Sequence, residues 1–358
     1  MSKLIVSCGG TGGHYYPGLS IAREAQARGL EVSLFLTGKR APAQAEIAKK
    51  HNLQSKLARA LSLPSPRKPW RIPVFAYRFW CDYLKAKKFL REEKPDAVLF
   101  MGSFAGVPLG IACAHLKVPI YIHEGNVWAG KANRFLSKYA TKFLASFPLK
   151  NDSAIQCPIA VVGMPIRPEL LEKDLKKPDI ISNLNDKDPL ILCFGGSQGA
   201  EAINKIFPYA YEVLRARKYP VQLVQLTGAD DNDELLESYG DSPVVVTKQS
   251  DEMGALIDRA AVVVCRAGAS SIAELIHFKT KTVLIPYPIA AEDHQEINAD
   301  YACQSKGFYK LHQSEIDQFS VANAVEWQLR QKGESLDFSM ISYPNAAERV
   351  LQEIFTST

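Results

Sequence analysis

Leu190-Ile191-Leu192-Cys193-Phe194-Gly195-Gly196-Ser197-Gln198-Gly199-Ala200 carries an apolar run directly into a glycine-rich turn. The same succession occurs near the N-terminus, where Leu4–Cys8 leads into Gly9-Gly10-Thr11-Gly12-Gly13-His14. Each apolar run predicts a buried strand, and each turn predicts the start of a helix. This succession is typical of doubly wound parallel sheets.

The glycine-rich turns also indicate a ligand. Glycine lets backbone N–H groups approach an anion, and the N-terminus of the following helix adds favourable partial charge. A third turn, Gly102-Ser103-Phe104-Ala105-Gly106, follows the apolar run Ala97–Met101. One such turn is weak evidence, because tight turns also use glycine for geometry alone. Two matching turns, one in each half, favour phosphate binding.

The chain is too long for one core, since 358 residues exceed the roughly 150 that a domain usually holds. Strand and helix patterns alternate in both halves, and residues 164–189 are rich in proline and charge, as in a linker. We therefore expect an α/β protein with two Rossmann-like domains, 1–162 and 163–344. A final helix, within 345–358, is expected to pack back on the first domain.

Composition and charge narrow the class of protein. Hydrophobic residues make up 47% and charged residues 23%, which is ordinary for a globular protein. The net charge of +5 divides into +15 for residues 1–160 and −10 for residues 161–358. The first half is therefore expected to meet an anionic partner, unless the division is chance.

Several features exclude other classes. No apolar run reaches the ~18 residues that span a bilayer, and the N-terminus does not read as a signal peptide. The seven cysteines lie far apart, so we expect reduced thiols and no metal site. The turns match neither a nicotinamide-binding fingerprint nor a P-loop. Asp186-Lys187-Asp188 reads as a solvated turn.

Two segments of the second half, Arg266–Glu274 and Glu292–Ala299, are rich in polar residues. Ser270 or Ser271 is expected to cap a helix, which places Glu274 about one turn further on. A carboxylate can accept from both hydroxyls of a ribose. His294 and Gln295 offer donors to sugar hydroxyls. The plainer alternatives are compensation of the helix dipole by Glu274 and an ordinary polar helix start at His294.

Together these motifs resemble the MurG family of N-acetylglucosaminyltransferases, from residue 3 to about residue 310. The resemblance rests on Gly9–His14, His123–Asn126, Gly163–Arg167, Gly195–Ala200, Arg266–Glu274 and His294–Ala299. It implies a GT-B fold, whose two domains face each other across a cleft. It also implies inverting transfer of N-acetylglucosamine from UDP to the 4-hydroxyl of the muramoyl sugar of lipid I, giving lipid II. No cofactor or dedicated metal is expected.

The resemblance assigns site residues. On the donor side, Arg167, Gly196, Ser197 and Gln198 are expected near the diphosphate, Glu274 with Ser270 and Ser271 at the ribose, His294 and Gln295 at the sugar, and Ser250 and Met253 near the uracil. On the acceptor side it implies Thr11, Gly12, Gly13, Ser103 and Asn126. Gly125, Met164, Ser103 and the Trp128-Ala129-Gly130 turn depart from the family pattern, mostly on the acceptor side.

His14 is the expected base, because imidazole titrates near neutrality and the residue follows a glycine turn. Glu124 is the alternative base. A third possibility is that His14 only hydrogen-bonds its loop or an acceptor phosphate.

Residues 67–91 account for part of the basic charge of the first half. Aromatic and cationic residues alternate there, as suits a bilayer interface; they include Trp70, Arg71, Phe75, Arg78, Phe79 and Trp80. We expect a peripheral protein on the cytoplasmic face of the bacterial inner membrane, binding UDP-N-acetylglucosamine and lipid I but no nucleic acid. Part of this stripe also belongs to the core.

Two other functions remain open. One is a GT-B transferase that uses a UDP-sugar on a different glycolipid acceptor. The other is a non-catalytic relative that binds UDP-sugar or anionic lipid.

Overall fold

The chain forms two compact units in the computed structural model, which describes residues 2–61, 64, 69–171, 175–196, 199–228, 233–331 and 336–355. The first unit is Met1–Arg167 with Tyr343–Thr358, and the second is Pro168–Ser342. The chain leaves the first unit after Arg167 rather than after residue 162. The reason is local, since the Ser20 hydroxyl donates to the carbonyl of Ile166 at 2.7 Å and the Arg167 guanidinium lies over the Tyr16 ring.

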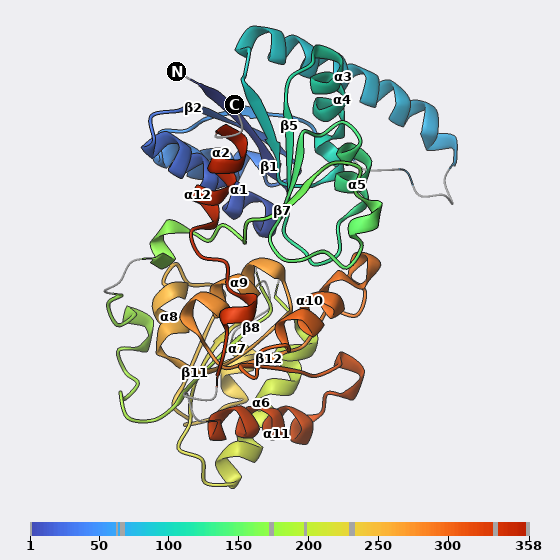
Figure 1. The fold of residues 1–358 in the computed structure, drawn as a ribbon. Helices are drawn as coiled ribbons and strands as arrows, with labels where there is room; N and C mark the ends of the chain where they lie inside the picture. Colours follow the sequence, from blue (N-terminus) through green and yellow to red (C-terminus); the bar gives the residue numbers. More distant parts are fainter. Residues whose placement is uncertain are drawn as a thin grey trace. The chain divides into compact units, whose positions relative to one another are not determined.

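The first unit holds a parallel seven-stranded sheet in the order β3-β2-β1-β4-β5-β6-β7 (Figure 1). The strands are β1 (Lys3–Gly9), β2 (Glu31–Thr37), β3 (Gln54–Leu57), β4 (Ala97–Phe100), β5 (Ile120–Glu124), β6 (Lys142–Ala145) and β7 (Ile159–Val161). Strand order reverses between β1 and β4. Ligands of open parallel sheets bind beyond the carboxyl ends of the strands at such a reversal.

Helices cover both faces of this sheet. They are α1 (Gly12–Ala27), α2 (Ala41–Lys50), α3 (Ile72–Glu93), α4 (Val107–Leu116), α5 (Lys131–Ser137) and α12 (Ala346–Phe355), with short 3₁₀ turns η1 (Pro69–Arg71), η2 (Phe104–Gly106) and η3 (Asp152–Ala154). Successive side chains of a strand point to opposite faces. In β1, Leu4 and Val6 therefore join the core under α1, α2 and α12, whereas Ile5 joins the core under α3, α4 and α5.

The last helix, α12, closes the first unit. It packs against α1 and buries Val350, Leu351 and Ile354 in the core that β1 shares with α1. The Tyr121 hydroxyl, on β5, donates to the carbonyl of Ile354 at 3.2 Å. The C-terminal segment is thus tied to the sheet by apolar burial and by a buried hydrogen bond.

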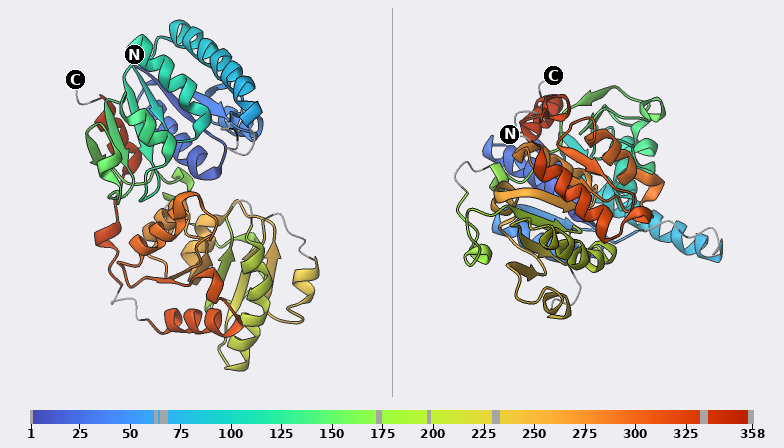
Figure 2. Two further views of the ribbon diagram at one scale, coloured as in Figure 1. Left: turned by 90° about the vertical axis from the view of Figure 1, so that its right-hand side faces the viewer. Right: turned by 90° about the horizontal axis from the view of Figure 1, so that it is seen from below.

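The second unit repeats the design with a parallel six-stranded sheet in the order β10-β9-β8-β11-β12-β13 (Figure 2). Its strands are β8 (Leu190–Phe194), β9 (Gln222–Leu226), β10 (Val244–Thr247), β11 (Ala260–Cys265), β12 (Thr282–Leu284) and β13 (Phe308–Lys310). Strand order reverses between β8 and β11, the position that corresponds to β1 and β4 in the first sheet.

The helices of the second unit are α6 (Glu201–Ala216), α7 (Asp233–Glu237), α8 (Met253–Arg259), α9 (Ala269–Phe278), α10 (His294–Ala302) and α11 (Gln318–Arg330). Its 3₁₀ turns are η4 (Pro168–Leu171), η5 (Asp179–Ile181), η6 (Ala291–Asp293), η7 (Gln313–Glu315) and η9 (Ser339–Ile341). α6 and α11 pack together over one face of the sheet, where Ile191 and Val262 meet Phe207 and Val325.

The predicted fold class, two doubly wound parallel α/β sheets, is confirmed. Short or polar edge elements were not predicted, among them β3, β7, β13 and α2. α1 begins at Gly12, within the glycine-rich turn, although its first turns consist of glycine, histidine, tyrosine and proline instead of an apolar pattern. Within the described ranges, no helix is long and apolar enough to cross a membrane.

The packing of α12 leads to a stability prediction. Leu351→Ala should lower the free energy of unfolding of the first unit by about 2–4 kcal/mol, because the side chain is buried and the neighbouring core cannot fully close the cavity. Urea unfolding measures the change. Gln352→Ala, at the neighbouring exposed position, is the control and should stay within about 0.5 kcal/mol. Equal effects of the two substitutions would contradict the packing role of α12.

Candidate functional site

The turn after β1 is built by close backbone contacts. A Cβ on Gly9 would lie 2.6 Å from the carbonyl oxygen of Thr37, and a Cβ on Gly38 would lie 2.8 Å from the Cα of Gly10. Both positions therefore require glycine, as the geometric explanation of the turn proposes. Gly12 and Gly13 form the first turn of α1, with Thr11 as its N-cap residue. That first turn carries no acidic residue, so no side chain there offsets its positive dipole end.

His14 links the turn after β1 to the turn after β4. Its imidazole lies against Gly102, where a Cβ would be 2.9 Å from Nε2, and its Nδ1 is 3.4 Å from Oγ1 of Thr11. Ser103 follows with a φ of +79°, a left-handed conformation that usually favours glycine. Its hydroxyl accepts from the N–H of Ala105 at 3.4 Å, and this bond holds the start of η2.

Glu124, at the end of β5, is buried and accepts four hydrogen bonds. Oε1 accepts from the backbone N–H of Asn126 at 3.0 Å and from its side-chain amide at 3.1 Å. Oε2 accepts from the N–H of Gly130 and from the amide of Asn133, each at 2.9 Å. These bonds order the segment 125–133. Both oxygens of the Glu124 carboxylate are therefore engaged with the protein's own N–H groups.

His123 precedes Glu124 and is buried. Its Nε2 lies 3.2 Å from the carbonyl oxygen of Gly163, so Nε2 carries the proton and donates. Burial lowers the pKa of His123 to about 4, so the ring is neutral near pH 7. The Ser146 hydroxyl donates to Sδ of Met164 at 3.7 Å. Met164, which departs from the family pattern, is thus buried in the interior of the first unit.

Arg167 was expected at the donor diphosphate. In the structure, its guanidinium lies over the ring of Tyr16, 5.1 Å from the centroid, so α1 of the first unit holds it.

The turn after β8 is tighter than the turn after β1. A Cβ on Gly195 would lie 2.3 Å from the backbone nitrogen of Ala200, so the chain folds back directly onto the start of α6. Gly196 follows with a φ of +82°, and none of the described atoms lies within 4 Å of its Cβ position. Ser197 and Gln198, both expected at the diphosphate, lie outside the described residues.

The residues predicted to bind the ribose lie on α9, but the two serines do not cap this helix as predicted. The helix begins at Ala269, and its N-cap residue is Gly268, with extended backbone at φ −70° and ψ 136°. The prediction that Ser270 or Ser271 caps the helix is therefore wrong, because the chain turns helical before reaching them. Both serines lie in the first turn, and Glu274, half-buried, lies in the second.

Gln295 is oriented by a network that the sequence did not reveal. The backbone N–H of Tyr287 donates to Oε1 of Gln295 at 3.0 Å. The buried Arg266 in turn donates from Nη1 to the carbonyls of Ile285 and Pro286, each at 3.1 Å, and lies over the Tyr287 ring. Because Oε1 is engaged, the amide nitrogen of Gln295 is the part that can donate to a ligand.

The remaining predicted donor residues border the same carboxyl edge. His294 is the first residue of α10 and follows Glu292 and Asp293, whose φ values are +53° and +51°. The hydroxyl of Ser250 accepts from the N–H of Glu252 at 3.0 Å, just before Met253 opens α8. In the part of the chain that the structure describes, no cluster of three or more His, Cys, Asp or Glu could hold a metal ion.

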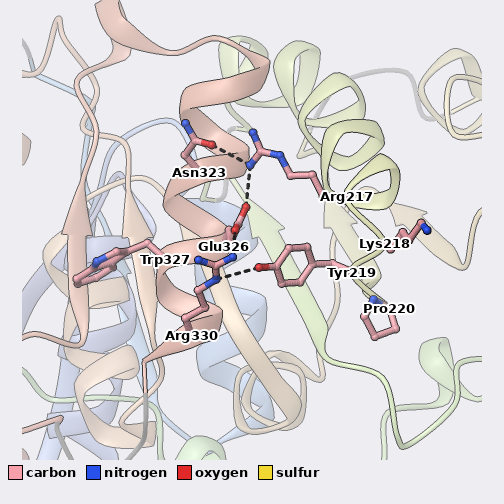
Figure 3. A pocket seen from close by; sticks show the side chains of 8 residues that line it. All are labelled: Arg217, Lys218, Tyr219, Pro220, Asn323, Glu326, Trp327 and Arg330. Carbon is pink, nitrogen blue, oxygen red and sulfur yellow. Dashed lines mark hydrogen bonds and ion pairs between the residues drawn. The ribbon is translucent and has the colours of Figure 1, made fainter.

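A cavity of about 870 Å³ in the second unit lies away from these turns (Figure 3). Tyr219 and Pro220, in its lining, precede β9, so it is at the amino ends of the strands. Arg217 donates to Oε2 of Glu326 at 2.8 Å, and Arg330 donates to the Tyr219 hydroxyl at 3.0 Å. Since these groups pair with one another, the cluster joins α11 to the end of α6.

Comparisons with known proteins identify the family of the chain. Residues 4–145 match the glycosyltransferase family 28 N-terminal domain, and residues 190–352 match the family 28 C-terminal domain. A protein of Aeromonas hydrophila is 32% identical, over 99% of this chain and 96% of its own length. One of Colwellia psychrerythraea is 30% identical, over 98% and 90%. Both are named UDP-N-acetylglucosamine–N-acetylmuramyl-(pentapeptide) pyrophosphoryl-undecaprenol N-acetylglucosamine transferase.

This chain belongs to the MurG family of glycosyltransferase family 28. The fold is also that of Acinetobacter baumannii MurG, with a TM-score of 0.77 and 24% identity over 99% of this chain and 100% of that one. A UDP-GlcNAc 2-epimerase from Neisseria meningitidis has the same architecture, with a TM-score of 0.68 at 13% identity over 99% and 100% of the two chains.

The buried neutral His123 predicts a pH dependence of stability. Its pKa is lower in the folded protein than in the unfolded chain, so the unfolded state binds the extra proton between about pH 6.5 and pH 4. As the pH is lowered through that window, the free energy of unfolding should therefore decrease by roughly 3 kcal/mol more in the unmodified protein than in His123→Gln. Urea unfolding of the first unit at pH 7 and pH 4 measures the difference. His51→Gln, at a partly exposed histidine, is the control and should follow the unmodified protein.

Proposed function

We propose that the chain transfers N-acetylglucosamine from UDP-N-acetylglucosamine to the 4-hydroxyl of the muramoyl sugar of lipid I, giving lipid II for peptidoglycan synthesis. The observation that carries this proposal is the similarity to transferases of that name over nearly the whole chain, at 30–32% identity in the two relatives described. The site residues of both units support the assignment.

On the acceptor side, His14 is proposed as the general base. In an inverting displacement, the 4-hydroxyl oxygen attacks the anomeric carbon and loses its proton to the imidazole, while the bond to UDP breaks. The ring is held between Thr11 and Gly102, and a partly exposed imidazole is accessible to a sugar hydroxyl. Thr11, Gly12, Gly13, Ser103 and Asn126 are proposed to surround the acceptor.

On the donor side, the leaving diphosphate gains negative charge as the bond breaks. We assign its stabilisation to the backbone of the Gly195-Gly196 turn and the first turn of α6, without a dedicated metal ion. Glu274 is proposed to accept from the ribose hydroxyls. Gln295 is proposed to donate from its amide nitrogen to a hydroxyl of the donor sugar.

We further propose that α3 and the preceding turn bind the cytoplasmic face of the bacterial inner membrane. Trp70 is 67% exposed and Trp80 59% exposed, and Arg71 and Arg78 lie beside them at the surface. Aromatic rings and cations suit the interface with anionic lipid, where the acceptor resides. Phe75 and Phe79 are half-buried instead, and the Phe75 ring pairs with the Phe104 ring of η2.

A second candidate is a transferase of the same fold and donor that acts on another glycolipid. It is favoured by the departures at Ser103 and Gly125, both within the first unit. An acceptor panel separates the two candidates.

The decisive test is a transfer assay with radiolabelled UDP-N-acetylglucosamine and a short-chain lipid I analogue. The protein should form the disaccharide-lipid, and His14→Ala should lower kcat by roughly 10²–10⁴-fold while UDP-N-acetylglucosamine still binds. His51→Ala is the matched control and should keep full activity. Transfer only to other glycolipids in the panel would overturn the lipid I assignment, and unchanged kcat in His14→Ala would remove His14 as the base.

The Gln295 orientation can be tested separately. Gln295→Glu keeps an oxygen to accept from Tyr287 but loses the amide donor, so the KM for UDP-N-acetylglucosamine should rise about tenfold. Affinity for UDP alone should stay the same, because UDP lacks the sugar. Gln304→Glu, at an exposed position beyond α10, is the control. A parallel loss of UDP affinity would show that the substitution disturbs the whole donor site.

A further inference from the structure

We infer that a small pocket on the α3 side of the first unit binds the diphosphate-proximal isoprene unit of the acceptor lipid, with cations at its rim for the adjoining diphosphate. This inference rests on the proposed function, because it assumes a polyprenyl-linked acceptor. The pocket has a volume of about 100 Å³ and lies between β3, α3 and the η2–α4 segment.

The floor of the pocket is apolar. Phe35 of β2, Phe89 of α3 and Leu109 of α4 line it, and all three are buried in the core under α3 and α4. Leu57, the last residue of β3, also lines it and is 49% exposed. An engineered apolar cavity of about 150 Å³ holds benzene, so this pocket is sized for a fragment of about five carbons rather than for a long chain.

The rim of the pocket is cationic. Lys56, Arg59 and Lys85 line it, and no ion pair with another described residue engages any of them. Asp82 also lines the pocket, which leaves a net charge of about two positive units. An apolar floor below such a rim is complementary to an isoprenyl diphosphate, whose phosphates attract cations and whose chain avoids water.

The position of the pocket agrees with the order of groups in the acceptor. Ala105 and Pro108, which line the pocket, follow Ser103 in the turn after β4. That turn contacts His14 through Gly102. The turn after β4 thus contacts the proposed base at Gly102 and lines the pocket at Ala105, which is the order of sugar, diphosphate and isoprene in the acceptor. α3, which forms one wall of the pocket (Figure 1), also carries Trp80 of the proposed membrane-binding surface, so we place the pocket next to the bilayer from which the polyprenyl chain enters.

Two acceptors in detergent solution test this inference without a membrane. Both carry the diphosphate-linked muramoyl peptide, one with a two-isoprene chain and the other with a methyl ester. The unmodified protein should prefer the two-isoprene acceptor by about tenfold in kcat/KM. Leu57→Gln should reduce this preference to below about threefold without changing kcat/KM for the methyl ester. Lys85→Gln should raise the KM of both acceptors and leave that of UDP-N-acetylglucosamine unchanged.

Lys88→Gln is the matched control, because Lys88 is an exposed cation of α3 that does not line the pocket. It should behave like the unmodified protein. Leu57 and Lys85 are themselves exposed, so their substitutions should not disturb folding. A preference for the isoprene chain that survives Leu57→Gln would overturn the inference.

Direct binding separates this inference from the proposed function. Calorimetry with geranyl diphosphate should show binding that Leu57→Gln and Lys85→Gln each weaken, and inorganic diphosphate should bind less tightly than the geranyl compound. If the protein transfers sugar to neither acceptor but this pattern holds, the pocket stands and the lipid I assignment fails. If geranyl diphosphate binds no better than inorganic diphosphate, the isoprene pocket is wrong whatever the transfer assay gives.

Discussion

The candidate sites depend on backbone segments that approach more closely than any side chain allows. A Cβ at Gly102 would collide with the imidazole of His14, and a Cβ at Gly195 would collide with the backbone of Ala200. Because these positions lack a Cβ, the strand-to-helix turns of each sheet fold tightly beside the helix that follows. His14 can then lie against a neighbouring turn, and the start of α6 lies against the end of β8. The same constraint operates in both units, although their sequences differ around it.

Around these turns, buried polar groups hold the loops that carry the predicted contacts. Glu124 gathers four donors from the segment 125–133. Arg266 holds two carbonyls of the segment before Tyr287, which in turn orients Gln295. Unpaired polar groups are costly in a protein interior, so each network is stable only with its partners in place. These residues act through others, by fixing where the ligand-facing groups lie.

Part of the positive charge of the first half of the chain lies on α3 of the first unit. α3 carries exposed cations and Trp80 on its outer side, and buries Tyr83, Ala86, Phe89 and Leu90 on its inner side. One helix thus joins the core, the proposed membrane surface and the pocket proposed for the acceptor lipid. The basic half of the protein is also the half that holds His14 and the predicted acceptor turns.

Strand-helix alternation and the glycine-rich turns were enough to predict two parallel α/β sheets, because both signals are local in sequence. They also located the strand ends beside which His14 and Gly196 lie, since ligands of parallel sheets bind beyond the carboxyl ends of the strands. Tertiary structure decided the rest. Ser270 and Ser271 do not cap α9, because the helix already begins at Ala269, directly after the extended Gly268. Phe75 and Phe79 are half-buried, because η2 meets α3 there. The partners of Glu124 and Arg266 depend on loop paths that no local pattern encodes, and the packing of α12 joins residues more than 300 positions apart in sequence to α1.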